Sequence, residues 1–272
     1  PEEIPTEKDV EKQEKVIAVV GVRGGVGAST FVSSCAWITA HELDRHIALL
    51  DLDLHFGTNA LIFDLEPGRG LCDALENPGR VDGLFIERAM IKESDKLSIL
   101  GAEASLNEPY APDPAAISHL LNELRQNFQN VIMDVPKIMA SQHPMILSES
   151  TDIILVTDLS LAATRDTIRL LSLVKKVAPD AKVFVLANRV GTNAHIEVDP
   201  KDFEASVEAE ISWSLPFDQK TMVMASKTGK ALPQVASASK MVNSLRDITK
   251  QILGIEEAKE KKSLLGLFKK SA

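Results

Sequence analysis

The sequence predicts an α/β fold in which a mostly parallel, twisted sheet carries helices on both faces. Short apolar runs of strand length recur along the chain and alternate with stretches whose apolar residues fall at helical spacing. The first two runs, residues 16–20 and 46–52, flank a helical stretch, and a strand–helix–strand unit pairs its strands in parallel. Repetition of this unit predicts helices packed on both sides of one sheet.

Composition fits a single globular domain. The chain has 272 residues, of which 44% are hydrophobic, and length alone does not require a second core. We expect a charged linker or tail over residues 1–15, one domain over residues 16–254, and a flexible amphipathic tail over residues 255–272. Because the first residue is Pro1, we also expect the natural protein to begin upstream of this chain.

Charge and cysteine content narrow the functional classes. The 39 acidic residues exceed the 30 basic ones, and a net charge of −9 repels nucleic acid unless basic groups cluster. Nucleic acid is therefore not an expected partner. Cys35 and Cys72 match no disulfide framework and no metal-site spacing, which indicates a reducing cytoplasm.

The glycine-rich stretch after the first strand is a candidate phosphate site. A strand that feeds a glycine turn opening a helix points backbone N–H groups and the positive helix end at one spot. A turn that only packs the helix on the strand is the alternative. The residues of this candidate loop are Arg23, Gly24, Gly25, Val26, Gly27, Ala28, Ser29 and Thr30.

The loop departs from the common pattern G-x-x-x-x-G-K-[ST]. Val22 stands in place of the first glycine and Ala28 in place of the lysine that binds the outer phosphates. Ser29 keeps the hydroxyl that this pattern places on Mg²⁺.

The remaining elements follow from periodicity and turn residues. We expect helices over residues 28–43, 112–129, 161–177, 200–207 and about 234–253, a mostly helical connection over 68–93, and strands over 96–100, 131–135, 152–157, 182–187 and 211–215. Asp113 is a candidate helix cap.

Carboxylates end two of the predicted strands. Asp51 and Asp53 follow one strand, and Asp134 closes another, at the edge where ligands bind in open α/β sheets. In phosphate-loop proteins such an aspartate holds Mg²⁺. Helix capping by Asp53 or Asn59, and chance in the case of Asp134, are the alternatives.

Several co-ordered motifs resemble the ParA/MinD ATPases, from about residue 16 to the end of the chain. These motifs are RGGVGAST (23–30), DLDLHFGTN (51–59), VIMDVP (131–136), TDLSLAATRDT (157–167), LANR (186–189) and LPFD (215–218). The resemblance implies the P-loop NTPase fold of the SIMIBI class. The RGGVG loop without its final lysine is most similar to the CpaE/TadZ group of Tad (Flp) pilus assembly proteins.

This resemblance implies ATP and Mg²⁺ as cofactors and a homodimer that closes around two ATP molecules. Arg23 matches the extra lysine that reaches the partner's phosphates, and Asp53 matches the residue that orients the attacking water. The other matches are Ser29, Asp51 and Asp134 for Mg²⁺ and Asn188 and Pro216 for adenine. Losing one charge-assisted contact at Ala28 costs roughly 1.5–3 kcal/mol, so we expect binding to survive and hydrolysis to be weak or absent. A strand-end turn is the other interpretation of Asn188.

The resemblance further implies a cytoplasmic protein, peripheral on the inner membrane at a cell pole, whose partners are pilus and secretion machinery. A MinD-like cycling ATPase that positions division or other machinery is an alternative. So is a redox protein like the nitrogenase iron protein, although Cys35 and Cys72 do not lie at its cluster motifs.

The end of the chain is a candidate membrane contact. On a helical projection Leu264, Leu265, Leu267 and Phe268 share one face, with Lys262, Lys269 and Lys270 on its flanks and back. This pattern predicts contact with an anionic membrane surface through residues 261–270, as in the tail of MinD proteins. Docking on the protein's own surface, or fraying, is the alternative.

Overall fold

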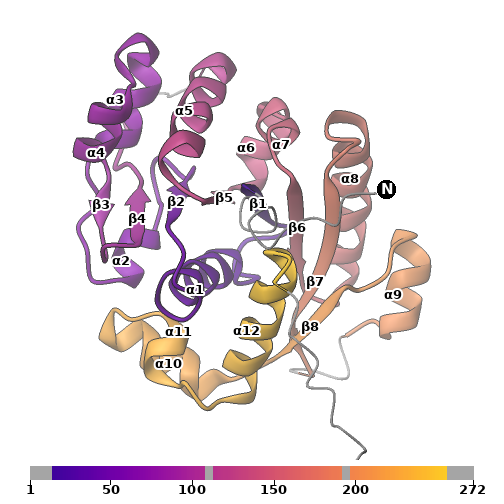
Figure 1. The fold of residues 1–272 in the computed structure, drawn as a ribbon. Helices are drawn as coiled ribbons and strands as arrows, with labels where there is room; N and C mark the ends of the chain where they lie inside the picture. Colours follow the sequence, from indigo (N-terminus) through magenta and orange to yellow (C-terminus); the bar gives the residue numbers. More distant parts are fainter. Residues whose placement is uncertain (1–13, 108–112, 192–196, 256–272) are drawn as a thin grey trace, which may run out of the picture.

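The computed structural model describes residues 14–107, 113–191 and 197–255, and their centre is one eight-stranded sheet (Figure 1). The strand order is β3-β4-β2-β5-β1-β6-β7-β8. Every neighbouring pair is parallel except β3 and β4. The strands are β1 (Lys15–Gly21), β2 (Ile47–Asp51), β3 (Ile91–Lys92), β4 (Leu97–Leu100), β5 (Asn130–Val135), β6 (Asp152–Thr157), β7 (Lys182–Val190) and β8 (Trp213–Pro216).

Helices cover both faces of this sheet, as predicted (Figure 1). One face packs against α3 (Gly70–Glu76), α4 (Gly83–Ala89), α5 (Pro114–Asn127), α6 (Lys137–Gln142), α7 (Met145–Ser148), α8 (Leu161–Val177) and α9 (Pro200–Val207). The other packs against α1 (Ala28–His41), α10 (Gln219–Thr228), α11 (Leu232–Val235) and α12 (Lys240–Ile252). The short helix α2 (Asn59–Ile62) contacts α1, and the 3-10 turn η2 (Pro78–Arg80) joins α3 to α4.

The central strands are apolar on both sides because each side contributes to a different core. In β1, Val16, Ala18 and Val20 belong to one core, and Ile17 and Val19 belong to the other. A strand buried on both faces shows a continuous apolar run instead of alternation. This explains why unbroken apolar runs located the strands.

Several strand boundaries differ from the prediction by one to three residues, and the structure explains two of them. β1 begins at Lys15, inside the expected linker, because the Lys15 ammonium pairs with the buried Asp152 carboxylate at 2.8 Å. β7 continues to Val190, three residues beyond its predicted end. The register between β7 and β8 shifts between Ala187 and Val190, and Arg189 there has a φ of 60°, so a bulge lets the strand go on.

The predicted helix from about residue 234 to 253 is wrong in its first part. It divides into α11 and α12, and the Ser239 side chain accepts a hydrogen bond from the Val242 N–H and so starts a separate helix. The short elements α2, α6, α7, α10 and β3 are additional to the prediction.

The expected terminal segments lie almost wholly outside the described residues. These are residues 1–13 of the linker and residues 256–272 of the tail. None of the helices within the described ranges is long and apolar enough to cross a membrane.

Candidate functional site

The glycine loop joins β1 to α1 and opens into a pocket at the carboxyl ends of β1, β2 and β5. The pocket is lined by Gly21, Arg23, Gly24, Gly25, Val26, Gly27, Ala28, Ser29, Thr30, Asp51, Asp53, Phe56, Gly57, Thr58, Asp134, Val135, Pro136, Lys137, Arg189 and Met222. All the predicted phosphate-binding and magnesium-binding residues therefore gather at one place.

Glycine is required in the loop by conformation and by space. Gly25 and Gly27 have φ angles of 79° and 92°, which side chains with a Cβ rarely adopt. A Cβ on Gly27 would also lie 2.5 Å from Nδ2 of Asn188. This amide donates a 2.7 Å hydrogen bond to the Val26 carbonyl. Because Asn188 belongs to β7, this strand fixes the shape of the loop.

The start of α1 is left open toward the pocket. Gly27 is its N-cap, no side chain caps the helix, and its first turn contains no acidic residue. The first N–H groups of a helix need acceptors from outside it, and the positive helix end favours an anion. A Cβ built on Gly24 or Gly25 would meet no atom within 4 Å, so the loop has free space in front of it. These features fit a phosphate chain.

Two buried carboxylates face each other across β2 and β5. Asp51 and Asp134 are paired in the register of the two strands. Nδ2 of Asn59 bridges them, at 2.9 Å from Asp51 Oδ2 and 2.8 Å from Asp134 Oδ2. Ser29 also lies close enough to Asp134 to lower the pKa of that carboxyl group, so the loop and the acidic pair are neighbours.

The pKa values of both carboxyl groups are raised. Burial raises the pKa of Asp51 despite its hydrogen bonds from Asn59. Burial, and then the neighbouring Asp51 charge, raise the pKa of Asp134 to about 6. A cation at this position would favour the ionised form of both groups.

The third acid, Asp53, lies beside this pair in a tight turn. Its backbone N–H donates to Asp51 Oδ1 at 3.2 Å, and its own Oδ1 accepts from the Phe56 N–H at 3.0 Å. A Cβ on Gly57 would lie 2.7 Å from Asp51 Oδ2, so only glycine lets the chain pass there.

The donor set fits Mg²⁺ bound together with phosphate. Within the described ranges, no group of three or more His, Cys, Asp or Glu residues could hold a metal ion alone. Mg²⁺ commonly takes one or two carboxylates and completes its shell with water and phosphate oxygens. Ser29, Asp51 and Asp134 provide such a partial set.

Arg23 projects from the loop toward α8. Its Nη1 lies 3.3 Å from Oδ2 of Asp166, and its side chain is 45% exposed. The same Asp166 oxygen accepts a 2.9 Å hydrogen bond from Nζ of Lys137. Both cations line the pocket of the glycine loop.

Asn188 and Pro216 lie in an adjoining groove with Gly27, Thr30 and Phe31. Asn188 is buried, and besides its bond to the loop its Oδ1 accepts from the Arg189 N–H at 2.9 Å. The structure therefore gives Asn188 a role in holding the loop, and adenine contact for Asn188 and Pro216 stays a prediction.

Asn59, Lys137 and Asp166 complete the arrangement and had no predicted role in binding. Asn59 lies within the motif DLDLHFGTN, and the sequence alone indicates only a helix cap there. Lys137 follows the motif VIMDVP directly, so a basic residue next to that motif was the available signal.

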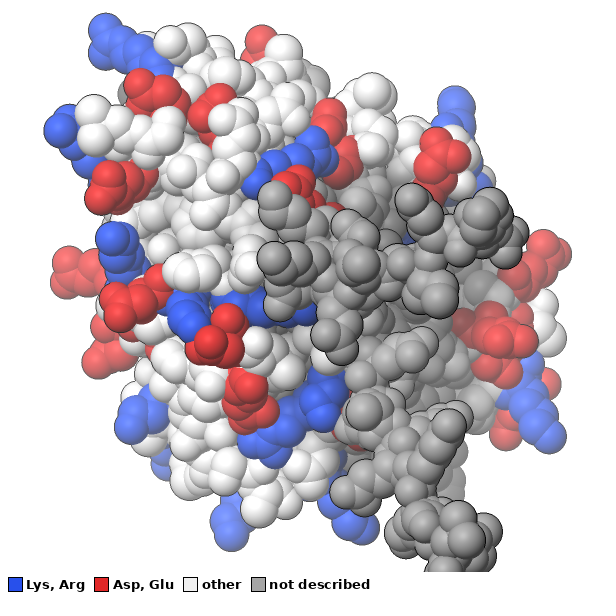
Figure 2. Space-filling view, in the orientation of Figure 1, with Lys and Arg blue, Asp and Glu red and all other residues white. Residues whose placement is uncertain are grey.

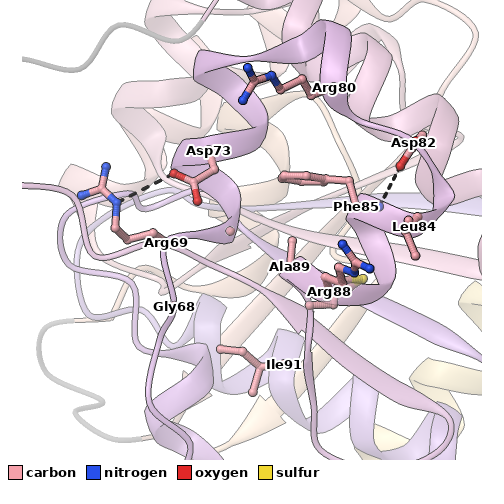
Figure 3. Close-up of a pocket in the computed structure, with 12 residues that line it drawn as sticks. Gly68, Arg69, Asp73, Arg80, Asp82, Leu84, Phe85, Arg88, Ala89 and Ile91 are labelled. Carbon is pink, nitrogen blue, oxygen red and sulfur yellow. Dashed lines mark hydrogen bonds and ion pairs between the residues drawn. The ribbon is translucent and has the colours of Figure 1, made fainter.

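A larger pocket lies away from this site, between α3, η2 and α4 (Figure 3). Its volume is about 590 Å³, against about 450 Å³ for the pocket of the glycine loop. Arg69, Arg80, Arg88 and Phe85 line it, and Arg69 forms a long ion pair with Asp73. It shares no residue with the glycine loop or the acidic strand ends, so size does not identify the phosphate site.

The surface charge bears on nucleic-acid binding, and the positions of the two thiols bear on a redox protein with a metal cluster. Among the described residues visible in Figure 2, Lys and Arg side chains are interspersed with Asp and Glu and form no broad basic area. Cys35 and Cys72 are buried in the cores on opposite faces of the sheet. Burial raises the pKa of Cys35 to about 12. Neither thiol is placed to ligate a cluster at the surface.

Sequence comparisons with a family model and with a known relative agree on the type of protein. The family model described as "Cellulose biosynthesis protein BcsQ" matches residues 14–201, more than half of the chain. The septum site-determining protein MinD of Bacillus subtilis is 24% identical over 247 residues, which are 88% of this chain and 89% of MinD.

Solved structures share the fold over nearly their full length. The ParA family ATPase from Chlorobium tepidum superposes with a TM-score of 0.79 at 21% identity, covering 87% of this chain and 97% of that one. MinD from Pyrococcus horikoshii, complexed with Mg-ADP, gives a TM-score of 0.72 at 19% identity, covering 88% and 95%. The mostly parallel sheet with helices on both faces is thus the P-loop NTPase fold of the ParA and MinD proteins. The chain belongs to the family described as cellulose biosynthesis protein BcsQ, one of the ParA/MinD-type ATPase families.

Proposed function

We propose that this protein binds MgATP at the glycine loop, dimerises around the nucleotide, and hydrolyses it slowly or not at all. The observation that carries the proposal is an open glycine loop that lines one pocket with a pair of buried acids, while Ala28 stands in place of the phosphate-binding lysine. The Mg-ADP complex of the similar MinD from Pyrococcus horikoshii supports this choice of ligand.

Each residue of the pocket has a role in this proposal. The N–H groups at the start of α1 hold the phosphates, and Ser29, Asp51 and Asp134 hold Mg²⁺ directly or through water. Asp53 orients a water molecule for the slow hydrolysis, and Arg23 contacts the phosphates bound by the partner subunit. Bound Mg²⁺ supplies charge neutralisation of the phosphates.

Calorimetry and a turnover assay test the proposal. Titration of the wild-type chain with MgATP should show binding, and its turnover should be well below that of the Ala28→Lys variant. Absence of binding would overturn the proposal. A wild-type rate equal to that of Ala28→Lys would contradict the assignment of slow turnover to the missing lysine.

Dimerisation has its own test. Arg23→Ala should reduce MgATP-dependent dimer formation in sedimentation more than it reduces nucleotide binding, while Arg80→Ala, at an exposed position in the other pocket, should behave as the parent. Asp53→Ala should accumulate the ATP-bound dimer. An Arg23→Ala chain that dimerises like the parent would remove the contact in trans.

For the cellular role we propose assembly and localisation of a Tad (Flp) type IV pilus secretion system, from the cytoplasmic side of the inner membrane at a cell pole. The support is the loop RGGVGAST, which combines Arg23 with the loss of the lysine and resembles the CpaE/TadZ group.

A second candidate role is cellulose biosynthesis, because the family model that matches residues 14–201 carries that description. A third, MinD-like positioning of division machinery, has the likeness to MinD in its favour. Deleting the gene in its host separates the three. Loss of surface pili, loss of cellulose, or misplaced septa would each select one role and exclude the others.

A further inference from the structure

Lys137 is a cation of the pocket that the proposed function leaves without a role. It is the first residue of α6 and follows Pro136, which ends the segment that begins with the buried Asp134 on β5. Its side chain is 43% exposed and lines the same pocket as Ser29 and Ala28. Lys137 is thus near the expected phosphates without being part of the glycine loop.

Its partner in the structure is a carboxylate that also holds Arg23. Oδ2 of Asp166 accepts from Nζ of Lys137 at 2.9 Å and lies 3.3 Å from Nη1 of Arg23. The two cations therefore share one partner, Asp166 Oδ2 on α8, and lie within two hydrogen-bond lengths of each other. The hydrogen bond from Lys137 is the larger cause, and together with the nearby Arg23 charge it holds the pKa of Asp166 below its usual range.

The loop itself lacks the corresponding charge. Ala28 stands where the common loop has a lysine that reaches the β and γ phosphates, and its methyl group cannot replace an ammonium. An ammonium on a flexible four-carbon stem can take the same place from a different backbone position, because lysine acts on phosphate as a point charge.

We propose that Lys137 supplies, from the segment after β5, the phosphate-binding ammonium that the loop lost at Ala28. In this proposal, which rests on the proposed function, Lys137 leaves Asp166 and binds the terminal phosphate when ATP enters. Ion pairs at the surface are weak, and Lys137 is 43% exposed in its pair with Asp166. A charge-assisted bond to a multiply charged phosphate is stronger, and Asp166 keeps Arg23 as a partner, so the exchange is favourable.

The position of Lys137 also indicates which phosphate it contacts. The N–H groups of the loop and of α1 cradle the inner phosphates. Lys137 approaches from the side of Asp134, whose carboxylate is expected to lie near Mg²⁺ and the outer phosphates. The ammonium should therefore discriminate ATP from ADP.

Calorimetric titration with MgATP and with MgADP tests this assignment. Lys137→Met should weaken MgATP binding about tenfold or more and MgADP binding much less. The matched control is Lys175→Met, at an exposed position near the other end of α8, which should bind both nucleotides like the parent. Thermal melting without nucleotide should be nearly unchanged in both variants, because Lys137 is 43% exposed and Asp166 keeps its contact with Arg23.

A compensating substitution tests whether the two positions serve the same phosphate. Adding Ala28→Lys to Lys137→Met should restore MgATP affinity, and Lys137→Arg should retain much of it. Asp166→Asn, which frees the cations from their carboxylate, should tighten MgATP binding several-fold.

The outcomes separate this inference from the proposed function. If the parent binds MgATP and Lys137→Met binds it as well as Lys175→Met does, only the role of Lys137 is overturned. Failure of Ala28→Lys to restore binding to Lys137→Met would also overturn it. If the parent binds no nucleotide, both proposals are wrong.

Discussion

Asp134 is a residue whose charge is costly in the folded chain. Its carboxyl group is buried next to Asp51, and its pKa is raised to about 6 from an ordinary value of 3.8. The folded state therefore holds a proton on Asp134 more tightly than the unfolded state does. Stability falls as the pH rises from about 4 through 6, and above that the full cost of the ionised group remains.

Replacing this charge should stabilise the protein without nucleotide. Asp134→Asn is expected to raise the free energy of unfolding by about 1–3 kcal/mol at pH 7.5, since each pKa unit corresponds to about 1.4 kcal/mol. At pH 4.5 the gain should shrink several-fold, because Asp134 is then protonated. Urea denaturation at the two pH values measures both, and the exposed Asp180→Asn is the control. An equal gain at both pH values would contradict the assignment to ionisation.

Substituting Asn188 tests whether this residue supports the loop or contacts a ligand. Asn188→Ala leaves the buried Val26 carbonyl without its 2.7 Å donor, so we expect a loss of about 1–3 kcal/mol of stability in the absence of nucleotide. Chemical denaturation measures it, with the exposed Asn122→Ala as control. An unchanged free energy of unfolding together with weaker ATP binding would instead favour a purely adenine-binding role.

At the scale of elements, the ion pair between Lys15 and Asp152 links the amino-terminal ends of two central strands. It joins the first residues of the neighbouring strands β1 and β6, and both side chains are at least nine-tenths buried. The Thr151 hydroxyl donates a further 2.6 Å hydrogen bond to Asp152.

Breaking this pair from one side should be severe. Lys15→Met leaves the Asp152 charge buried and is expected to cost about 3 kcal/mol or more in unfolding free energy. The double variant Lys15→Met/Asp152→Asn removes that charge and should recover much of the loss. Urea denaturation of the single and double variants provides the comparison. A small effect of Lys15→Met alone would show that solvent reaches the pair.

The sequence predicted some elements well because their cause is local. The helix over residues 161–177 was predicted with the bounds of α8, since its apolar periodicity lies within the segment; the structure adds a cap, the Ser160 side chain, which accepts from the Ala163 N–H. β3 has only two residues, too few for any period. The extension of β7 depends on a bulge at Arg189, and the pairing with β8 that permits it is set by tertiary structure.

At the scale of the whole molecule, the candidate site was predicted where residues follow an ordered motif. Arg23, Ser29, Asp51 and Asp134 line one pocket because parallel strands bring their carboxyl ends to one edge, and their roles in binding stay predictions. The contact of Lys137 with Asp166 joins segments that share no motif, so only the assembled fold reveals it.

The predicted amphipathic tail lies outside the described residues, and we propose that it attaches the whole protein to membranes. A short amphipathic segment binds lipid weakly, but a dimer presents two, and the second insertion can raise avidity by roughly a hundredfold. We expect MgATP to increase co-sedimentation of the intact chain with anionic liposomes, and a chain cut after Leu253 to stay in solution. Neutral liposomes are the control for the lysines. Equal pelleting of the intact and cut chains would remove the membrane role.

The hydrogen bond between Asn188 and Val26 spans 162 positions of the chain. A ribosome makes the glycine loop before β5 and β6, which flank β1, and before the amide that fixes the loop. Translation proceeds at about 5–20 residues per second, so the nascent chain spends roughly 10–30 seconds with a loop sequence but no finished cradle. The glycine loop therefore gains its support from Asn188 only after β7 has been made, and a chain truncated before β7 carries the motif without that support.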